Sequence, residues 1–298
     1  MDYRQEMRDF VIEISTFSKS QNPNFIVIPQ NGHELVLKED GKLANDYLSA
    51  IDGLGQEDLN FGYIGDNVPT PEENRNYILQ QLLAGQKKGK TVLVTDYAEG
   101  NKNYNTSETL NSKRGFISYV AEERDLTIIP EQKNKLKHNN SNDIENLKKA
   151  QNFLYLLNFE QFETKEELLN SLQETNYDIF ILDAFYHSKL FTPQDLEKIR
   201  YKKSGGKRLL ISYMSIGEAE DYRFYWNSDW DASNINWIDA ENPKWKGNYK
   251  VKYWNKDWKR IITGTSSSYL QRIIDAGFDG VYLDIIDAFW YFENKKDL

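Results

Sequence analysis

The feature that most constrains the fold of this 298-residue chain is a regular alternation of short apolar runs with helical segments. Runs such as FIVIPQN, TVLVTDY, YDIFILDAF and GVYLDIID are apolar at nearly every position, which is typical of parallel strands buried on both faces. Between the runs, apolar residues recur at helical spacing, as at Met7, Phe10, Val11 and Ile14. About eight strand candidates, VKYW among them, predict an α/β fold, and we expect a single (β/α)₈ TIM barrel over residues 1–298.

Two polar segments depart from this alternation. Residues 98–114 are rich in Asn, Gly, Ser and Thr and predict a long surface loop. Residues 130–147, PEQKNKLKHNNSNDIENL, predict a polar linker, because they cannot bury enough apolar surface to offset the cost of ordering them. The chain also begins with an unpaired helix and ends soon after its most strongly patterned strand. Since the first and last strands of a closed barrel are neighbours, we expect the linker to join two permuted halves.

Composition excludes several classes of function. The formal net charge of -9 opposes binding to nucleic acid, whose phosphates need a basic surface. The chain has no Cys, and His33, His138 and His187 lie far apart, so we expect no metal site. No glycine-rich fingerprint follows a strand, and we expect no cofactor. We expect a monomer. We also expect no membrane span, because no apolar run is long enough, and the amino terminus is charged rather than signal-like.

Polar side chains stand where the predicted strands end, which is where the active site of a barrel lies. They are Asn31, Glu57, Asp96, Asp183, Glu218, Glu220, Arg223, Asp284 and Asp287. Any one acidic residue there is equally explained as a helix cap, but six strands ending this way are harder to attribute to capping. Crowded carboxylates differ in pKa, and glycoside cleavage needs one protonated carboxyl group and one carboxylate.

Six of the seven tryptophans fall in one window of the sequence. They are Trp226, Trp230, Trp237, Trp245, Trp254 and Trp258. Flat aromatic rings offer platforms to the C–H faces of sugars and to ammonium groups. We expect about half of these rings to serve only in packing.

The segments GEAEDYRFYW, NPKWKGNYKVKYW and GFDGVYLDIID resemble the endo-α-1,4-polygalactosaminidase family, glycoside hydrolase family 114. The similarity is to its bacterial and archaeal branch, which often carries a misleading label as related to cysteinyl-tRNA synthetase. FIVIPQNGHEL, YLSAIDGLGQEDL and GKTVLVTDY resemble later strands of the family, so the resemblance covers nearly the whole chain. In the family, the segment like NFLYLLN comes first, and the one like GFDGVYLD runs straight into one like MRDFVIEIS. The resemblance therefore implies a circularly permuted (β/α)₈ barrel.

The resemblance also implies a glycoside hydrolase that cleaves an α-linked, galactosamine-containing polysaccharide with two carboxylates. Asp284, in DGVYLD, and Glu57, in DGLGQED, would be the catalytic pair, with Glu57 expected as the general acid and Asp284 as the nucleophile or base. The side chains that we expect to contact the substrate are Asn31, Asp96, Asp183, Tyr213, Glu220, Arg223, Trp254 and Asp287. One departure is Leu156, where the family has a Gln. The family is commonly exported, although no signal is visible here.

Three alternative functions can be compared with the sequence, and two of them are disfavoured. A non-catalytic carbohydrate-binding barrel would use the Trp-rich loops to bind, with the carboxylates only accepting hydrogen bonds from hydroxyl groups. A barrel isomerase or lyase for a phosphorylated metabolite is disfavoured, because no phosphate-binding loop follows a strand. A metal-dependent polysaccharide deacetylase is disfavoured by the scattered histidines.

Overall fold

The computed structural model describes residues 1–130 and 136–295, and parallel strands form its centre. Residues 131–135 of the predicted linker lie outside this range. The parallel strands are β1 (Ile26–Pro29), β2 (Gly53–Glu57), β5 (Thr91–Tyr97), β6 (Ile117–Ala121), β7 (Phe153–Leu156), β8 (Ile179–Leu182), β11 (Leu209–Ser215) and β15 (Gly280–Asp284). The α/β class with a parallel central sheet is confirmed.

The parallel strands form two sheets that meet at one bridge. One sheet has the order β1-β15-β11-β8-β7 and the other has the order β2-β5-β6. A parallel bridge between Gln30 and Gly55 joins the end of β1 to β2. On the other side, the rings of Tyr119 in β6 and Phe153 in β7 lie 5.5 Å apart. Beyond the two strands, the backbone N–H of Leu157 donates to the carbonyl oxygen of Leu126 at 3.0 Å.

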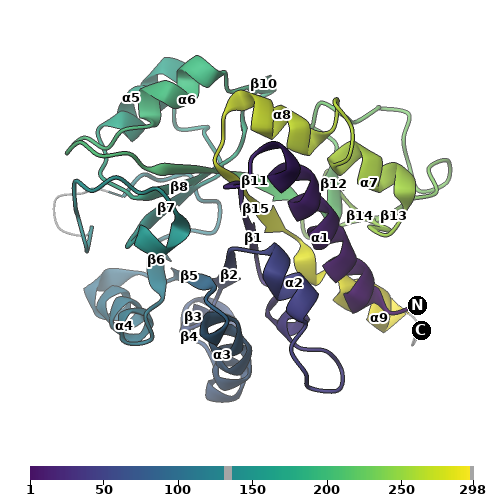
Figure 1. The fold of residues 1–298 in the computed structure, drawn as a ribbon, viewed down its shortest axis with the longest axis horizontal. Helices are drawn as coiled ribbons and strands as arrows, with labels where there is room; N and C mark the ends of the chain where they lie inside the picture. Colours follow the sequence, from purple (N-terminus) through teal and green to yellow (C-terminus); the bar gives the residue numbers. More distant parts are fainter. Residues whose placement is uncertain (131–135, 296–298) are drawn as a thin grey trace.

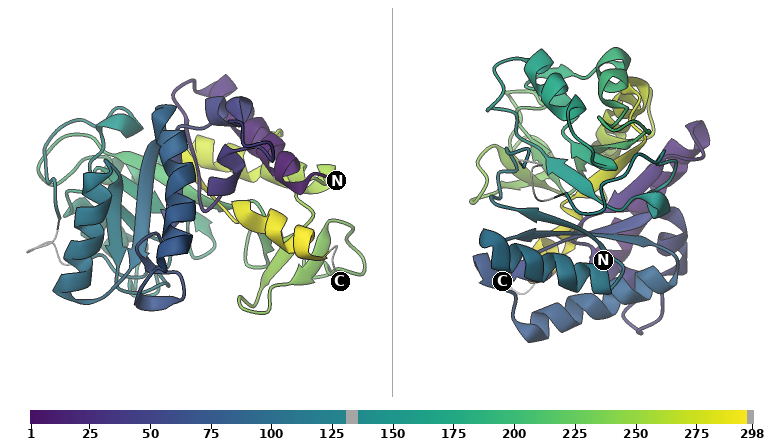
Figure 2. Two further views of the ribbon diagram at one scale, coloured as in Figure 1. Left: turned by 90° about the horizontal axis from the view of Figure 1, so that it is seen from below. Right: turned by 90° about the vertical axis from the view of Figure 1, so that its left-hand side faces the viewer.

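Helices lie around the outside of the strands, as Figures 1 and 2 show. They are α1 (Tyr3–Gln21), α2 (Asn45–Ala50), α3 (Glu72–Lys87), α4 (Gly100–Lys113), α5 (Lys165–Gln173), α6 (Pro193–Ile199), α7 (Lys256–Ile262), α8 (Tyr269–Ala276) and α9 (Phe289–Lys295), with short 3₁₀ turns η1 (His33–Val36), η2 (Leu147–Lys149) and η3 (Ile286–Ala288). Several helices begin at N-cap residues that can be recognised in the sequence. Thr192 and Asp195 form a reciprocal capping box for α6, and the hydroxyl of Ser268 accepts from the N–H of Gln271 in α8.

Short antiparallel elements extend from the parallel strands. They are the pair β3 (Phe61–Gly62) and β4 (Gly65–Pro69), the pair β9 (Phe185–Tyr186) and β10 (Lys189–Leu190), and the sheet of β12 (Glu218–Glu220), β14 (Asn248–Val251) and β13 (Ile238–Glu241). The first pair follows β2, the second follows β8 and the small sheet follows β11. They therefore build up the edge at which the parallel strands end.

Two of the sequence-based assignments are wrong. The predicted loop at 98–114 contains helix α4, whose buried stripe is polar and includes Ser107 and Asn111. Without an apolar stripe, helical periodicity does not show in the sequence. The predicted parallel strand VKYW holds only the end of β14, which is antiparallel, and the parallel strand in that count is instead β6, ISYVA.

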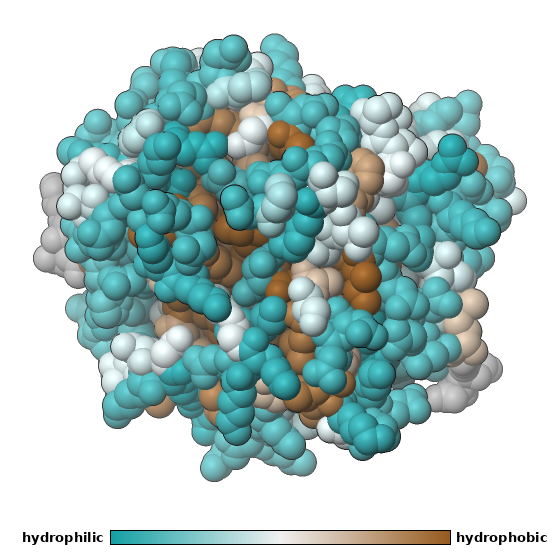
Figure 3. All heavy atoms as spheres, in the orientation of Figure 1, coloured by the Kyte–Doolittle hydropathy of each residue, from teal (hydrophilic) through white to brown (hydrophobic). Residues whose placement is uncertain are grey.

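The main apolar core runs through the described residues from Met7 in α1 to Phe292 in α9, and a small second cluster joins Phe61, Ala98 and Val120. On the face shown in Figure 3, hydrophilic residues cover most of the surface, and apolar side chains show toward the middle, where Figure 1 draws the strands. The described end of the predicted linker is held in place, since the N–H of Ile144 donates to the carbonyl oxygen of Lys207 at 2.9 Å. The two ends of the chain are neighbours, because Arg4 pairs with Glu293 at 2.9 Å.

Candidate active site

Glu57 and Asp284 are the last residues of β2 and β15, and β1 lies between these strands. Because neighbouring parallel strands end at the same edge, both carboxylates lie at the carboxyl-terminal mouth of the strands. Below this edge, the Tyr282 ring packs closely against β2. A Cβ at Gly55 would lie only 2.2 Å from the hydroxyl oxygen of Tyr282, so a glycine is required where the Tyr282 ring crosses β2.

Glu57 is held by donors on both carboxylate oxygens. The side-chain amide of Asn31 donates to Oε2 at 2.9 Å, and the hydroxyl of Tyr97 donates a short hydrogen bond to Oε1. Asn31 also accepts from the backbone N–H of Glu57 at 2.9 Å. Asn31 adopts a left-handed conformation, with φ of 57°, which turns its side chain toward Glu57. Two donors stabilise a negative charge on this carboxylate and fix its orientation.

Asp284 has a different environment. Its side chain is half-buried, and the hydroxyl of Tyr213 donates to Oδ2 at 2.7 Å. Burial, and next the charge of Glu57, raise the pKa of Asp284 to about 8. Near neutral pH, the neutral form of Asp284 is therefore favoured.

The turn after Asp284 is strained. Ile285 has a φ of 56°, a conformation that is rare for a β-branched residue and costs about 1–3 kcal/mol. The surrounding structure holds it there. The N–H of Ile216 donates to the carbonyl oxygen of Asp284 at 3.1 Å, and a Cβ at Gly217 would lie 2.1 Å from the carbonyl oxygen of Ile285. Strain of this kind collects at functional sites, where it fixes the direction of a side chain.

Asp183, Glu220 and Arg223 form one buried ion-pair network. The guanidinium of Arg223 donates to both oxygens of Asp183, at 2.8 and 2.7 Å, and to Oε2 of Glu220 at 2.7 Å. Burial alone would lower the pKa of Arg223, but the two carboxylates raise it well above its usual value. The exposed Tyr222 donates to the other oxygen of Glu220 at 2.6 Å. These charges are therefore largely satisfied within the protein.

Asp287 and Glu218 add two more carboxylates near the pair. Burial, opposed by a backbone hydrogen bond and assisted by the charges of Glu57 and Glu218, raises the pKa of Asp287 to about 6. Glu218 is 2% exposed, and its Oε1 accepts from Lys250 at 2.9 Å while its Oε2 has no partner among the described residues. This side of the mouth is therefore strongly acidic.

Two expected substrate contacts have other surroundings. Asp96 has no exposure to solvent and accepts from the N–H of Asn60 at 2.7 Å and from the hydroxyl of Ser107 at 2.6 Å, so it joins the segment after β2 to α4. Trp254 packs among Tyr3, Tyr253 and Phe292, with ring centroids 4.7–5.1 Å away. Both arrangements favour a structural role, and a substrate contact at Asp96 or Trp254 stays a prediction.

The sequence analysis did not single out three residues at or below the site, which are Tyr97, Tyr155 and Gln30. Tyr97, next to Asp96, contacts Glu57 directly. Deeper in the interior, the hydroxyl of Tyr155 donates to the side-chain oxygen of Gln30 at 3.0 Å. The signal that could have found Tyr97 is the alternation of side chains along β5, because Asp96 and Tyr97 point to opposite faces.

Most of the Trp-rich window serves packing. Trp226, Trp230, Trp237 and Trp258 form a chain of ring contacts with centroids 5.0–5.7 Å apart. Trp245, by contrast, is 55% exposed. Packing therefore accounts for more of the window than the expected half.

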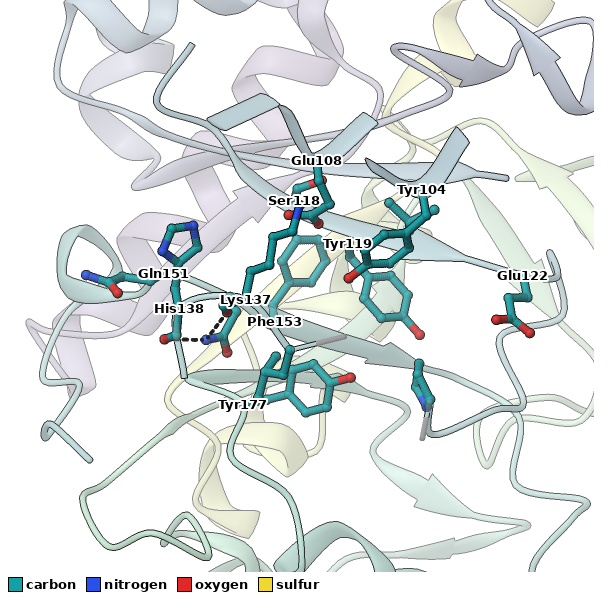
Figure 4. Close-up of a pocket in the computed structure, with 14 residues that line it drawn as sticks. Tyr104, Glu108, Ser118, Tyr119, Glu122, Lys137, His138, Gln151, Phe153 and Tyr177 are labelled. Carbon is teal, nitrogen blue, oxygen red and sulfur yellow. Dashed lines mark hydrogen bonds between the residues drawn. The ribbon is translucent and has the colours of Figure 1, made fainter. Parts of the chain in front are cut away.

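Figure 4 shows a pocket whose lining includes neither Glu57 nor Asp284. It lies between α4, β6 and β7, and its lining includes Tyr104, Glu108, Tyr119 and Tyr177. Its volume of about 40 Å³ has room for a few water molecules but not for a sugar ring. Within residues 1–130 and 136–295, no group of His, Cys, Asp and Glu is arranged to hold a metal ion, and no described helix could cross a membrane.

Comparisons with known proteins relate this chain to a protein family. A model of the glycoside-hydrolase family GH114 matches residues 133–298. The chain is 38% identical over 177 residues to an uncharacterized protein of Methanocaldococcus jannaschii, and 51% identical over 124 residues to an uncharacterized protein of Thermotoga maritima. A third uncharacterized protein, of Deinococcus radiodurans, is 36% identical over 127 residues. These alignments cover 56%, 42% and 43% of this chain, and they span less than half of the relatives, 47%, 37% and 39% of their lengths.

Proposed function

The chain belongs to glycoside-hydrolase family GH114, and on that premise we propose that it hydrolyses an α-linked polysaccharide with Glu57 and Asp284 as its catalytic pair. The observation that carries the proposal is the arrangement of these two carboxylates. They end strands on either side of β1, one is held by hydrogen-bond donors, and the other is half-buried with a raised pKa. Glycoside cleavage needs this difference in protonation.

The roles within the pair follow from where the proton resides. Burial and the charge of Glu57 favour the proton on Asp284 in the free protein. This favours Asp284 as the proton donor and Glu57 as the carboxylate, opposite to the sequence-based expectation. The expected roles instead require the proton to move to Glu57 when substrate binds. A substrate with a leaving group that needs no protonation separates the two, because it is cleaved in the first step by the variant that lacks the acid and not by the variant that lacks the nucleophile.

We also propose that the parallel strands close into one permuted (β/α)₈ barrel. Support comes from the Tyr119–Phe153 ring contact and from the Leu157–Leu126 hydrogen bond beside the unpaired edges of β6 and β7. The family match begins at residue 133, inside the predicted linker 130–147, and leaves β1, β2, β5 and β6 to the preceding residues. The Arg4–Glu293 pair supports a join between α9 and α1 in the order expected for the family.

The proposed substrate is a galactosamine-containing polymer, whose amino groups carry positive charge when they are not acetylated. The acidic side of the mouth supports it, since Glu57, Glu218, Asp284 and Asp287 act on one another electrostatically and Lys250 is the cation paired with Glu218. A net charge of -9 also attracts a polycation.

The experiment measures the release of reducing ends from α-1,4-linked galactosamine polymers and from neutral α-glucans by the wild type, Glu57→Gln and Asp284→Asn. We expect cleavage of the galactosamine polymer and a loss of about a thousandfold or more in each variant. A wild type that binds the polymer but does not cleave it would replace the hydrolase with a carbohydrate-binding barrel. Variants that keep their activity would assign the chemistry to other residues.

A further inference from the structure

A short hairpin leaves the active site directly after Glu57. We call residues 58–70, which contain β3 and β4, the arm. Asp58 starts it with a φ of 60°, a left-handed conformation that turns the chain sharply away from β2. The arm therefore stands on the rim of the mouth, on the Glu57 side.

The base of the arm is tied to the barrel strands. Asp96 in β5 accepts from the backbone N–H groups of Asn60 and Phe61, at 2.7 and 3.3 Å. The hydroxyl of Thr70 donates to the carbonyl oxygen of Asp58 at 2.7 Å, which closes the two ends of the arm on each other. These bonds are buried or half-buried, so the arm has a fixed direction rather than the freedom of a loop.

Arg124, from the segment after β6, links the arm to Glu57. Its guanidinium donates to Asp58 at 2.9 Å and to the carbonyl oxygen of Gly62 at 2.7 Å. It also lies 4.2 Å above the ring of Tyr97, the residue that donates to Glu57. Arg124 and Tyr97 thus connect the arm to the carboxylate of Glu57.

The tip of the arm exposes apolar side chains. Tyr63 is 49% exposed, Ile64 is 66% exposed and Val68 is 39% exposed. A hairpin that is anchored by polar bonds has no structural need for an aromatic ring at its tip. An exposed aromatic ring on a rigid support, next to a carbohydrate-cleaving site, offers a flat surface to the C–H face of a sugar.

We propose that the arm is a subsite for the glycan chain, with Tyr63 as the platform for a sugar residue remote from the bond that is cleaved. This rests on the proposed function. A platform for a sugar remote from the cleaved bond contributes binding to long substrates and nothing to short ones, so Tyr63 determines the preference for chain length. Ile64 widens the apolar surface at the tip.

The test compares hydrolysis of an α-1,4-linked galactosamine disaccharide and octasaccharide by the wild type, Tyr63→Ala and Tyr63→Trp. We expect Tyr63→Ala to raise KM for the octasaccharide about tenfold with kcat little changed, and to leave the disaccharide unaffected. Tyr63→Trp, which keeps a ring, should stay near the wild type. Tyr201→Ala removes a ring of similar exposure, 45%, that precedes β11 at the opposite ends of the strands, and should change neither substrate.

The outcomes separate this proposal from the proposed function. If the wild type cleaves and Tyr63→Ala matches it on the octasaccharide, or loses equally on both substrates, the subsite is wrong. If the wild type cleaves neither substrate, the hydrolase proposal fails, and binding of the octasaccharide decides about the arm. Weaker binding by Tyr63→Ala alone would support the arm, and equal binding or none would overturn it.

Discussion

The two halves of the chain each supply one carboxylate to the mouth, and they hold it in different ways. In residues 1–130, Glu57 is fixed by the amide of Asn31 and the hydroxyl of Tyr97. In residues 136–295, Asp284 receives one hydroxyl donor, from Tyr213, and stands before a strained turn. Hydrogen-bond donors stabilise the charged form of a carboxyl group, whereas burial beside a charged neighbour favours its neutral form. If the proposed function holds, the surroundings that each strand provides make an acid of one carboxyl group and a base or nucleophile of the other.

The largest effect is expected at Arg223, which joins Asp183 and Glu220. Replacing it by Met leaves two carboxylates unpaired, and we expect a loss of about 3–5 kcal/mol in the free energy of unfolding. Denaturant unfolding measures this loss. Arg223→Lys keeps the charge without the bidentate geometry and should lose less. Equal stability of Arg223→Met and the wild type would show that the ion-pair network contributes nothing to the free energy of unfolding.

The next effect concerns the stability of the fold as a function of pH. The folded-state pKa of Asp284, about 8, lies above its usual value of 3.8, so its protonated form stabilises the fold below pH 4 and this contribution is lost as the pH rises through 8. Asp284→Asn removes the penalty. We expect it to match the wild type near pH 4 and to be more stable by about 3 kcal/mol at pH 9, after a discount for contact with solvent. Thermal melts at both pH values measure this difference, and Asp221→Asn, at an exposed carboxylate, is the control.

A smaller effect separates the two tyrosines. Tyr97→Phe removes a donor that orients Glu57, and we expect kcat to fall about tenfold while the alkaline limb of the pH profile, which reports Asp284, stays in place. The Tyr213 hydrogen bond lowers the pKa of Asp284, so Tyr213→Phe should raise that pKa and move the alkaline limb of the pH profile upward. Identical profiles for the two variants would remove the distinction between the halves.

The smallest effect is expected when the order of the halves is exchanged. A chain that begins at residue 136, runs to 298 and continues through a short linker into residues 1–130 should keep the wild-type kcat and a Tm within about 5 °C. The neighbouring positions of Arg4 and Glu293 give the reason. An insoluble or inactive product would argue against the permuted barrel.

The sequence predicts the strands better than it predicts the directions of their side chains. Apolar runs located β1, β5, β8 and β15, because strands buried on both faces are apolar throughout. A strand that is apolar throughout does not show which of its faces points to the interior. The sequence therefore predicted Asp96 as a site residue and missed its neighbour Tyr97, which contacts Glu57. Helix α4 escaped because its buried side chains are polar. Motif resemblance indicated Glu57 and Asp284, whereas the proton between them depends on burial and proximity, which spacing alone does not show.

The most direct test of the account is a carbon NMR titration of the side-chain carboxyl groups in the wild type, Asp284→Asn and Glu57→Gln. The account predicts one aspartate that titrates near pH 8, is absent in Asp284→Asn, and titrates at lower pH in Glu57→Gln because the neighbouring charge is gone. A wild type in which every aspartate has lost its proton by pH 6 would contradict it. Asp284 and Glu57 would then be two ordinary carboxylates, and the difference between the halves would have no chemical consequence.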